Sequence, residues 1–225
     1  QKQGVTIKEI NRGSIFCSCL QLSFVEALAE LAKSDAESLF VESSGLADPS
    51  NIMEILESVK VLTGDVYDFQ GVICLIDGVH FPKQVKDTET VDRQLKHCDV
   101  AIINKIDLIS EEQYKKVFSL VREVNPHCKV LSCAHGQANL SFMKEAFLQG
   151  DWAFSEESLN TVDNKPKTIS LLCSENVEKG KFQQFLQAVL PECYRIKGFF
   201  LLDRSWTQVD VVEELIDYKP CPEKA

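Results

Sequence analysis

The sequence predicts an α/β protein with a mostly parallel sheet flanked by helices, followed by a small α+β domain. Three apolar runs support the sheet: residues 38–41 run into Glu42, residues 71–76 into Asp77, and residues 99–103 into Asn104. Apolar runs that stop at a carboxylate, Gly or Pro are typical of buried parallel strands. Because ligands bind beyond the carboxyl ends of such strands, we expect the polar groups there to converge on one crevice.

The remaining elements follow from capping signals and apolar periodicity. Helices are predicted at residues 23–32, 49–62, 90–97 and 110–124, and a fourth strand at residues 129–133. Residues 5–10 also alternate like a strand. Strand and helix alternate through residues 38–148, which is the pattern that βαβ units produce.

Composition divides the chain into two domains. Residues 1–150 hold the α/β pattern, whereas residues 151–167 are rich in Asp, Glu, Ser, Asn, Lys and Pro without periodicity, as linkers are. In residues 168–225, a strand at 168–172, a helix at 181–190 and a strand at 194–202 predict the small α+β domain. The last residues, from 219 to 222, are expected to be ragged.

Bulk properties exclude several classes of protein. The net charge of −10 argues against a nucleic-acid binder, and the 44% hydrophobic share is normal for a globular core. An apolar run of about 18 residues and a secretory leader are both missing, so we expect a cytoplasmic protein with no membrane partner. Its nine cysteines are expected to be reduced thiols, and only Cys17 and Cys19 are spaced like metal ligands.

The strongest functional signal is Asn104-Lys105-Ile106-Asp107, directly after an apolar strand. A carboxylate at that position can accept hydrogen bonds from N1–H and the 2-amino group of guanine, which adenine does not offer. The asparagine can bond base acceptors and the lysine stem can cover the ring. Backbone amides of Ser132, Cys133 and Ala134 would line the other edge of the base. The alternative is a polar turn that caps the next helix.

The chain resembles a known family at these motifs. Glu-Ser-Ser-Gly-Leu-Ala-Asp-Pro at residues 42–49, then a strand ending in Asp77, then the Asn-Lys-Ile-Asp turn, look like the CobW family of P-loop GTPases. These are metallochaperones related to the nickel-insertion GTPases. The resemblance extends upstream through residues 9–13 and downstream to residues 197–198. It implies a P-loop NTPase-like sheet in residues 1–150 and the family's C-terminal domain in residues 168–225.

The resemblance also implies roles at the first strand end. Glu42 would be the acidic residue near Mg²⁺ and the attacking water, and Gly45 would offer its backbone N–H to the γ-phosphate of GTP. A plainer interpretation of Glu42 is a strand-end carboxylate that caps the helix after Pro49. Asp77 is either a functional residue or only a turn residue before glycine.

The metal motif departs from the family pattern. Family members carry Gly-Cys-x-Cys-Cys, and the aligned residues 13–17 retain only Cys17. Cys19 creates a Cys-x-Cys pair that could hold Zn²⁺, with Co²⁺ or Ni²⁺ as poorer fits. A tetrahedral site would need further ligands, such as Glu9, a histidine or a second chain. Alternatively, the two thiols are packed near a helix start or are redox-active.

A second departure concerns the phosphates. The family's Gly-x-x-x-x-Gly-Lys-(Ser/Thr) loop is missing from the 225 residues. In the family this loop precedes the cysteine motif, so we expect an N-terminal truncation, and little or no GTP hydrolysis by these residues alone. The leading hypothesis is a GTP-binding, GTP-hydrolysing metallochaperone that couples nucleotide state to metal delivery to a client metalloprotein. The rivals are a non-catalytic GTPase-like module that binds a protein partner and, less favoured, a thiol redox protein.

Overall fold

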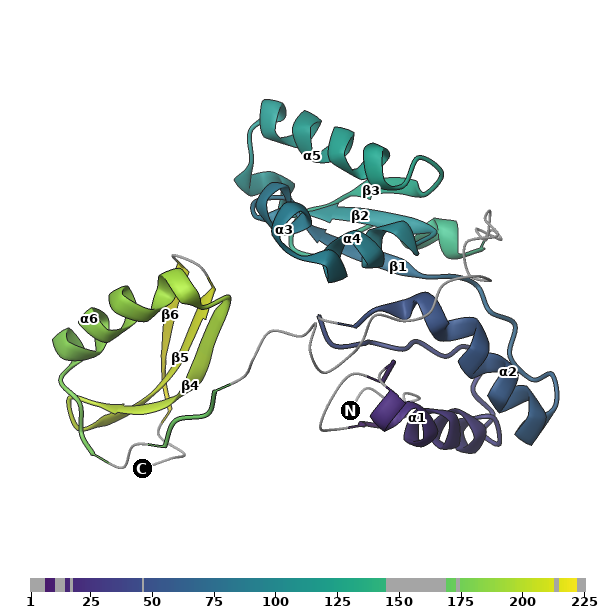
Figure 1. Cartoon of the computed structure of the whole chain (residues 1–225), viewed down its shortest axis with the longest axis horizontal. Helices are drawn as coiled ribbons and strands as arrows, with labels where there is room; N and C mark the ends of the chain where they lie inside the picture. Colours follow the sequence, from purple (N-terminus) through teal and green to yellow (C-terminus); the bar gives the residue numbers. More distant parts are fainter. Residues whose placement is uncertain are drawn as a thin grey trace. The chain divides into compact units, whose positions relative to one another are not determined.

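The computed structural model describes residues 7–10, 15–16, 18–45, 47–144, 169–172, 175–212 and 215–221. The chain divides into two compact units, Gln1–Pro166 and Lys167–Ala225 (Figure 1), and each is considered by itself. The segment expected to be a linker, residues 151–167, lies outside the described residues, so its character stays a prediction.

The N-terminal unit contains a parallel three-stranded sheet in the order β1-β2-β3. The strands are β1 (Ile73–Asp77), β2 (Val100–Asn104) and β3 (Lys129–Ser132). Strands β1 and β2 agree with the apolar runs at 71–76 and 99–103, and β3 agrees with the fourth strand predicted at 129–133. The register pairs Asp77 with Asn104 and Ile103 with Ser132. The three strands therefore end at one edge of the sheet, which brings their polar motifs together.

One face of this sheet is covered by three helices, α3 (Phe81–Asp87), α4 (Glu89–Lys96) and α5 (Glu111–Val124). Their buried side chains pack on alternate residues of the strands; the fully enclosed members include Leu95, Ile103, Val117 and Val121. The opposite face contacts the turn η3 (Leu140–Lys144) through Met143. Ser110 caps α5 by accepting a hydrogen bond from the Gln113 amide (3.2 Å), as the capping box predicts.

Helix α3 was not expected from the sequence, which predicts a single helix in this region. Its only buried residue is Phe81, and Val85, four residues later, packs against the same cluster. One apolar pair is too short a pattern to predict a helix. Pro82 lies in its first turn, where proline favours a helix start. The helix packs on the core through Phe81 and Val85.

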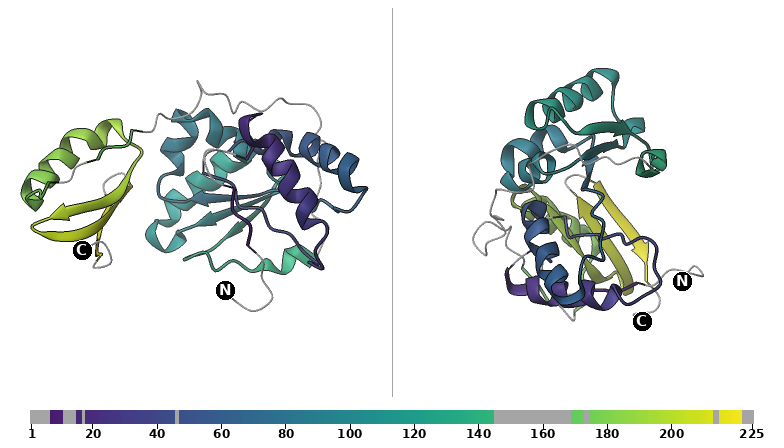
Figure 2. Two further views of the ribbon diagram at one scale, coloured as in Figure 1. Left: turned by 90° about the horizontal axis from the view of Figure 1, so that it is seen from below. Right: turned by 90° about the vertical axis from the view of Figure 1, so that its right-hand side faces the viewer.

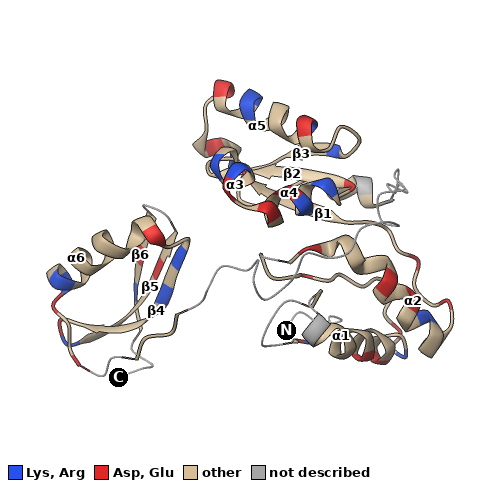
Figure 3. Ribbon diagram, viewed as in Figure 1, with Lys and Arg blue, Asp and Glu red and all other residues tan. Residues whose placement is uncertain are grey.

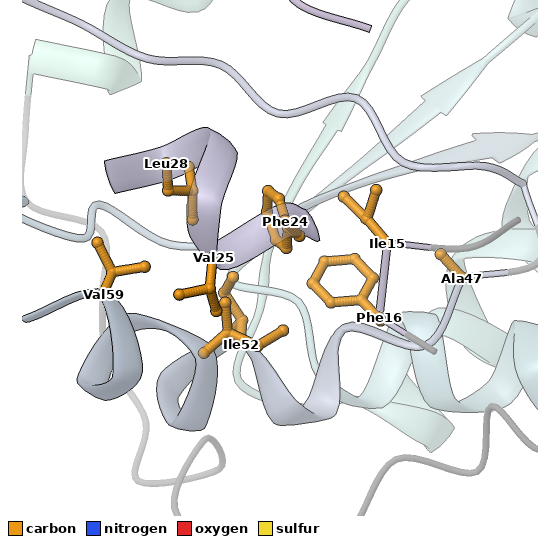
Figure 4. Packing of buried hydrophobic residues seen from close by; sticks show 9 residues of the cluster. Ile15, Phe16, Phe24, Val25, Leu28, Ala47, Ile52 and Val59 are labelled. Atoms are coloured by element: carbon orange, nitrogen blue, oxygen red, sulfur yellow. The ribbon is translucent and has the colours of Figure 1, made fainter. Parts of the chain in front are cut away.

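The N-terminal unit has a second cluster, built by α1 (Ser18–Leu31) and α2 (Ile52–Thr63), with η1 (Pro49–Asn51) leading into α2. Figure 4 shows Phe24, Val25 and Leu28 of α1 facing Ile52 and Val59 of α2. Helix α1 begins at Ser18, five residues before the predicted capping box at Ser23.

The strand predicted at residues 38–41 is wrong: these residues are not part of any sheet. Leu39, Phe40 and Val41 are 39%, 69% and 47% exposed. An apolar run becomes a strand only when a neighbouring strand takes up its backbone hydrogen bonds. Within the described part of the chain, nothing pairs with this run.

The C-terminal unit is an antiparallel sheet with one helix, which confirms the α+β prediction for fold class. The strands are β4 (Arg195–Leu202), β5 (Ser205–Val212) and β6 (Leu215–Pro220), and α6 (Lys179–Val189) followed by η5 (Leu190–Glu192) lies on one face (Figure 2). The core between them is formed by Phe182, Leu186, Leu202, Val209 and Val211.

Two expectations for this unit are wrong: residues 169–172 form no strand, and residues 219 and 220, expected to be ragged, lie inside β6. Strands β5 and β6 were not predicted. The turn between β4 and β5 explains one omission. Asp203 and Arg204 both have positive φ, 47° and 67°, the backbone of a tight hairpin, but they lack the Asn-Gly or Asp-Gly signal that usually marks one.

The distribution of charge and the length of the helices agree with what the composition predicts. Lys and Arg are interspersed with Asp and Glu along α5 (Figure 3), with no single-sign stripe on that helix. In the described residues, every helix is too short or too polar to cross a membrane.

Candidate functional site

The site forms where β1 and β2 end side by side. The Gly78 amide donates a hydrogen bond to the Asn104 carbonyl oxygen (3.1 Å). A Cβ at residue 78 would lie 2.9 Å from that same oxygen and 3.0 Å from Ile109. Glycine is therefore required here by close approach of two backbones, which explains the Asp-Gly that ends the second apolar run.

Asn104 fixes the loop after β3. Its side-chain oxygen accepts hydrogen bonds from the Gly136 amide (3.0 Å) and the Cys133 thiol (3.4 Å). Among the described residues, the side-chain NH₂ of Asn104 has no acceptor. One end of this amide therefore organises the site and the other remains able to donate to a ligand.

Lys105 is held in a left-handed conformation, with φ 61°. Its ammonium lies 2.8 Å from Oδ2 of Asp77. The same carboxylate accepts from the Val79 amide (3.0 Å) and lies 3.0 Å from Nδ1 of His80. Burial alone would raise the pKa of Asp77, but the hydrogen bonds from Lys105, His80 and Val79 together outweigh burial and lower that pKa. Asp77 is thus a charged residue at neutral pH.

Asp107 lies in the short turn η2 (Ile106–Leu108) and is exposed. Nε2 of His135 lies 3.5 Å from its Oδ2. The Cys133 amide donates to the Ile103 carbonyl (2.8 Å), so it extends the sheet. The Ala134 amide makes no hydrogen bond with the described residues, and Ser132 is the last residue of β3.

The segment 42–51 is attached to α4. Gln94 donates its side-chain amide to the carbonyl oxygens of Gly45 (3.0 Å) and Ala47 (2.7 Å). The space beside the Gly45 Cα is open, with nothing within 4 Å of an added Cβ. Glu42 is exposed, and its carboxylate contacts no partner in the described part of the chain. The structure does not join Glu42 or Gly45 to Asp107 by a direct contact.

A second set of hydrogen bonds, nearly buried, attaches the segment 42–51 to α4. Nε of Arg93 donates to Oδ2 of Asp48 (2.9 Å), and Nη2 donates to the Ser50 hydroxyl (3.0 Å). Asp48 also caps η1 by accepting from the Ser50 amide (3.1 Å). The side chains of Arg93 and Asp48 are 12% and 2% exposed. Consecutive residues of α4 thus hold both halves of the segment.

The cysteine motif lies mostly outside the described residues. Cys17 is not described; Cys19 belongs to the backbone of α1, but its side chain is not described. The preceding residues are anchored, since Asn51 donates its side-chain amide to the Phe16 carbonyl (3.3 Å). Ile15, Phe16 and Ala47 belong to one buried cluster (Figure 4). Within the described residues, no three His, Cys, Asp or Glu side chains are grouped to hold a metal ion.

Several residues of this arrangement were missed from the sequence. Gln113 reaches from α5 to the carbonyl oxygens of Gly78 and Val79 (3.2 and 3.1 Å), and Arg93, Gln94 and His80 act as described above. Gln113, Arg93 and Gln94 have no local signal, because their contacts join elements far apart in the chain, whereas His80 contacts Asp77 only three residues before it. Asp48 is the exception, since Asp before Pro is typical of a helix N-cap.

Comparison with known proteins adds to this geometry. The family profile described as "CobW/HypB/UreG, nucleotide-binding domain" matches residues 1–132, more than half of the chain. Among curated proteins, "Zinc chaperone YjiA" of Escherichia coli is 28% identical over 166 residues, covering 72% of this chain and 49% of its own. "Zinc-regulated GTPase metalloprotein activator 1" of Schizosaccharomyces pombe is 24% identical, covering 92% of this chain and 61% of its own. The chain thus spans about half to three fifths of these relatives.

A similar protein from Dictyostelium discoideum, also described as "Zinc-regulated GTPase metalloprotein activator 1", is 25% identical and covers 70% of this chain and 38% of its own length. Among solved structures, the "Zn(II)-bound YjiA GTPase from E. coli" is 23% identical, with a TM-score of 0.46, over 91% of this chain and 68% of that one.

Proposed function

The chain belongs to the CobW/HypB/UreG family, of which it carries the nucleotide-binding domain, and from that membership we propose that it binds a guanine nucleotide. The observation that carries the proposal is the Asn104-Lys105-Ile106-Asp107 turn, placed at the shared edge where β1, β2 and β3 end. In the whole protein this domain would serve a GTP-hydrolysing zinc metallochaperone that delivers metal to a client protein.

Each polar group at this edge has a fitting partner on guanine. The exposed carboxylate of Asp107 accepts from N1–H and the 2-amino group. The unused NH₂ of Asn104 donates to a ring acceptor, and the Ala134 amide donates to the carbonyl oxygen at C6. The alkyl stem of Lys105 covers one face of the ring. Adenine offers an acceptor and no 2-amino group toward Asp107, so the site discriminates against it.

Hydrolysis would involve the segment 42–51. Glu42 would act near Mg²⁺ and the attacking water, and the Gly45 amide would donate to the γ-phosphate. Two observations support this assignment: the Glu42 carboxylate is exposed, and the Cα of Gly45 faces open space that a phosphate can approach closely. The carbonyl oxygen of Gly45 accepts a hydrogen bond from Gln94, which would hold this residue in place for that contact.

Zinc is the metal we propose, because two of the relatives are described as a zinc chaperone and a zinc-regulated GTPase metalloprotein activator. Cys17 and Cys19 would supply a pair of thiolates, which suit Zn²⁺ better than Co²⁺ or Ni²⁺. Coupling to the nucleotide has a physical route in the described residues. Asn51 ties the residue before Cys17 to the same segment that contains Gly45.

The first test compares fluorescent mant-GDP with mant-ADP, using this chain and its Asp107→Asn variant. We expect binding of the guanine nucleotide only, and a loss of at least tenfold in affinity in the variant, because an amide cannot accept both guanine donors. Xanthosine diphosphate should gain affinity, since its C2 carbonyl accepts from the new NH₂. Asp65→Asn, which removes another exposed carboxylate, is the control. Equal affinity for both mant nucleotides would overturn the proposal.

The second test measures zinc affinity by competition with a chromogenic chelator, with and without GTP. The double variant Cys17→Ser/Cys19→Ser is expected to lose tight binding, whereas Cys193→Ser/Cys221→Ser, in the other unit, should retain it. Unchanged affinity in the first variant would remove the metal role. Guanine binding without zinc binding would instead support a non-catalytic module that recognises a protein partner.

A further inference from the structure

Asp77, at the end of β1, carries a carboxylate that makes none of the nucleotide contacts proposed above. Asp77 is directly paired with Asn104 in the strand register, so it lies one strand away from the turn that would bind guanine. Its side chain is about one quarter exposed and is charged at neutral pH. Two roles are open to such a residue next to a nucleotide: ligand to Mg²⁺ near the phosphates, or partner to a group that contacts the base.

The contacts of Asp77 favour the second role. Oδ2 is shared by the Lys105 ammonium at 2.8 Å and by Nδ1 of His80 at 3.0 Å. Oδ1 accepts from the backbone amides of Val79 and His80 at 3.0 and 3.4 Å. Both oxygens are therefore occupied by donors of this chain, and coordination of a cation would require breaking these contacts.

Lys105 is the group that gains from this arrangement. A lysine stem is flexible and loses considerable rotamer freedom when it is ordered. Here the backbone of Lys105 is already in the left-handed region, and its ammonium is tied at the far end by Asp77. A stem fixed at both ends presents its methylene groups as a preformed surface, so less ordering remains for the moment of binding.

The carboxylate is itself held in place. His80, directly before α3, contacts it from one side. Gln113 of α5 donates to the carbonyl oxygens of Gly78 and Val79, and so fixes the turn that supplies the Val79 amide. Three elements thus converge on the position of one lysine.

We propose that Asp77 is a positioning residue for the guanine site: together with His80 it fixes Lys105 against the base, and it does not bind Mg²⁺. This inference rests on the proposed function, because it assigns a role within the same guanine site. It predicts that Asp77 affects every guanine ligand alike, whatever the number of phosphates and whether or not Mg²⁺ is present.

The test measures affinity for GMP without Mg²⁺ and for GDP with Mg²⁺, by isothermal titration of the full chain. Asp77→Asn is expected to weaken both by about tenfold, which is about 1.4 kcal/mol. His80→Gln, which keeps a hydrogen-bonding group, should weaken both by a smaller factor. Asp217→Asn is the matched control, because it removes a carboxylate 2.7 Å from Lys219 in the C-terminal unit. Circular dichroism confirms that each variant is folded.

A double-mutant cycle supplies the readout that a purely structural role would not produce. If Asp77 acts through Lys105, Asp77→Asn/Lys105→Ala binds GMP no more weakly than Lys105→Ala alone. Additive losses would overturn the inference, and so would a loss confined to GDP with Mg²⁺, which identifies a metal ligand. If the unmodified chain binds neither GMP nor GDP, the proposed function itself fails and this inference fails with it. Binding that Asp77→Asn leaves unchanged rejects the inference alone.

Discussion

The buried pair of Arg93 and Asp48 allows a quantitative prediction, with Arg93→Met as the change. Methionine fills similar volume but removes the two hydrogen bonds to Asp48 and Ser50, at 2.9 and 3.0 Å. Asp48 is 2% exposed, so water cannot readily replace the guanidinium. Removing one partner of a buried ion pair costs about 3–5 kcal/mol. Because Arg93 retains some exposure, we expect about 3 kcal/mol of lost stability in the N-terminal unit.

Urea unfolding followed by circular dichroism measures the loss, and hydrogen exchange with mass spectrometry locates it. Exchange should accelerate most in peptides that cover residues 45–51. Arg195→Met breaks a pair with Asp210 that is far more exposed, so it should have a much smaller effect. Asp48→Asn/Arg93→Met should recover part of the loss, because the uncompensated charge is gone. A loss below about 1 kcal/mol, or one that the second change deepens, would refute the reasoning.

Three further outcomes are expected. Asn125→Ala should destabilise the chain by about 2–4 kcal/mol in urea unfolding, because Asn125, which is 7% exposed, forms hydrogen bonds with backbone groups of Leu95, Cys98 and Cys128. Asn139→Ala, at an exposed turn, is the control, and equal losses in the two variants would contradict the argument. Gly78→Ala should lower both melting temperature and GMP affinity, because its Cβ would lie 2.9 Å from the Asn104 carbonyl oxygen; an unchanged melting temperature would contradict it. Asp77 has a lowered pKa in the folded state, so the stability it contributes is present above the unfolded pKa of about 3.9 and is lost as the pH falls through the folded pKa. The difference in stability between the chain and Asp77→Asn should therefore shrink below about pH 4. A difference that grows there would contradict the prediction.

The sequence could predict the features that have a local signal, and it could not predict those that depend on long-range contacts. Strands β1 and β2 are apolar and end in a polar motif, and β3 follows a helix that ends at Asn125-Pro126, so their existence was predictable. Their parallel arrangement was predictable from the alternation of strand and helix. The Ser110 cap of α5 was predictable for the same reason, because all its parts lie within four residues. By contrast, the run at 38–41 has the composition of a strand, but pairing depends on a neighbour that composition cannot reveal.

The candidate site shows the same division. Asn104, Lys105 and Asp107 were identified because a short motif after a strand carries its own chemistry. Their supporting contacts were not, since Asp77 and Lys105 are separated by 28 residues and Gln113 and Gly78 by 35. Asp77, Gly78 and Lys105 belong to recognisable strand-end motifs, but no local pattern shows which of them contact one another, and none distinguishes Gln113 from a surface polar side chain. The sequence therefore predicts the groups that would face a ligand better than it predicts what holds them.

The supporting contacts converge on two pieces of the chain. The turn after β1 and the Asn-Lys-Ile-Asp turn are connected through Asp77 and Lys105, whereas residues 45–51 are connected through Gln94, Arg93 and Asn51. Helix α4, which supplies Gln94 and Arg93, also packs through Leu95 on the core beneath the sheet. A change in the peptide at Gly45 therefore has two ways to spread: through Gln94 to α4, and through Asn51 to the residue before Cys17. If nucleotide and metal are coupled as proposed, Asn51→Ala should uncouple them while leaving guanine affinity intact, because its bond to Phe16 is the described hydrogen bond that links the two segments.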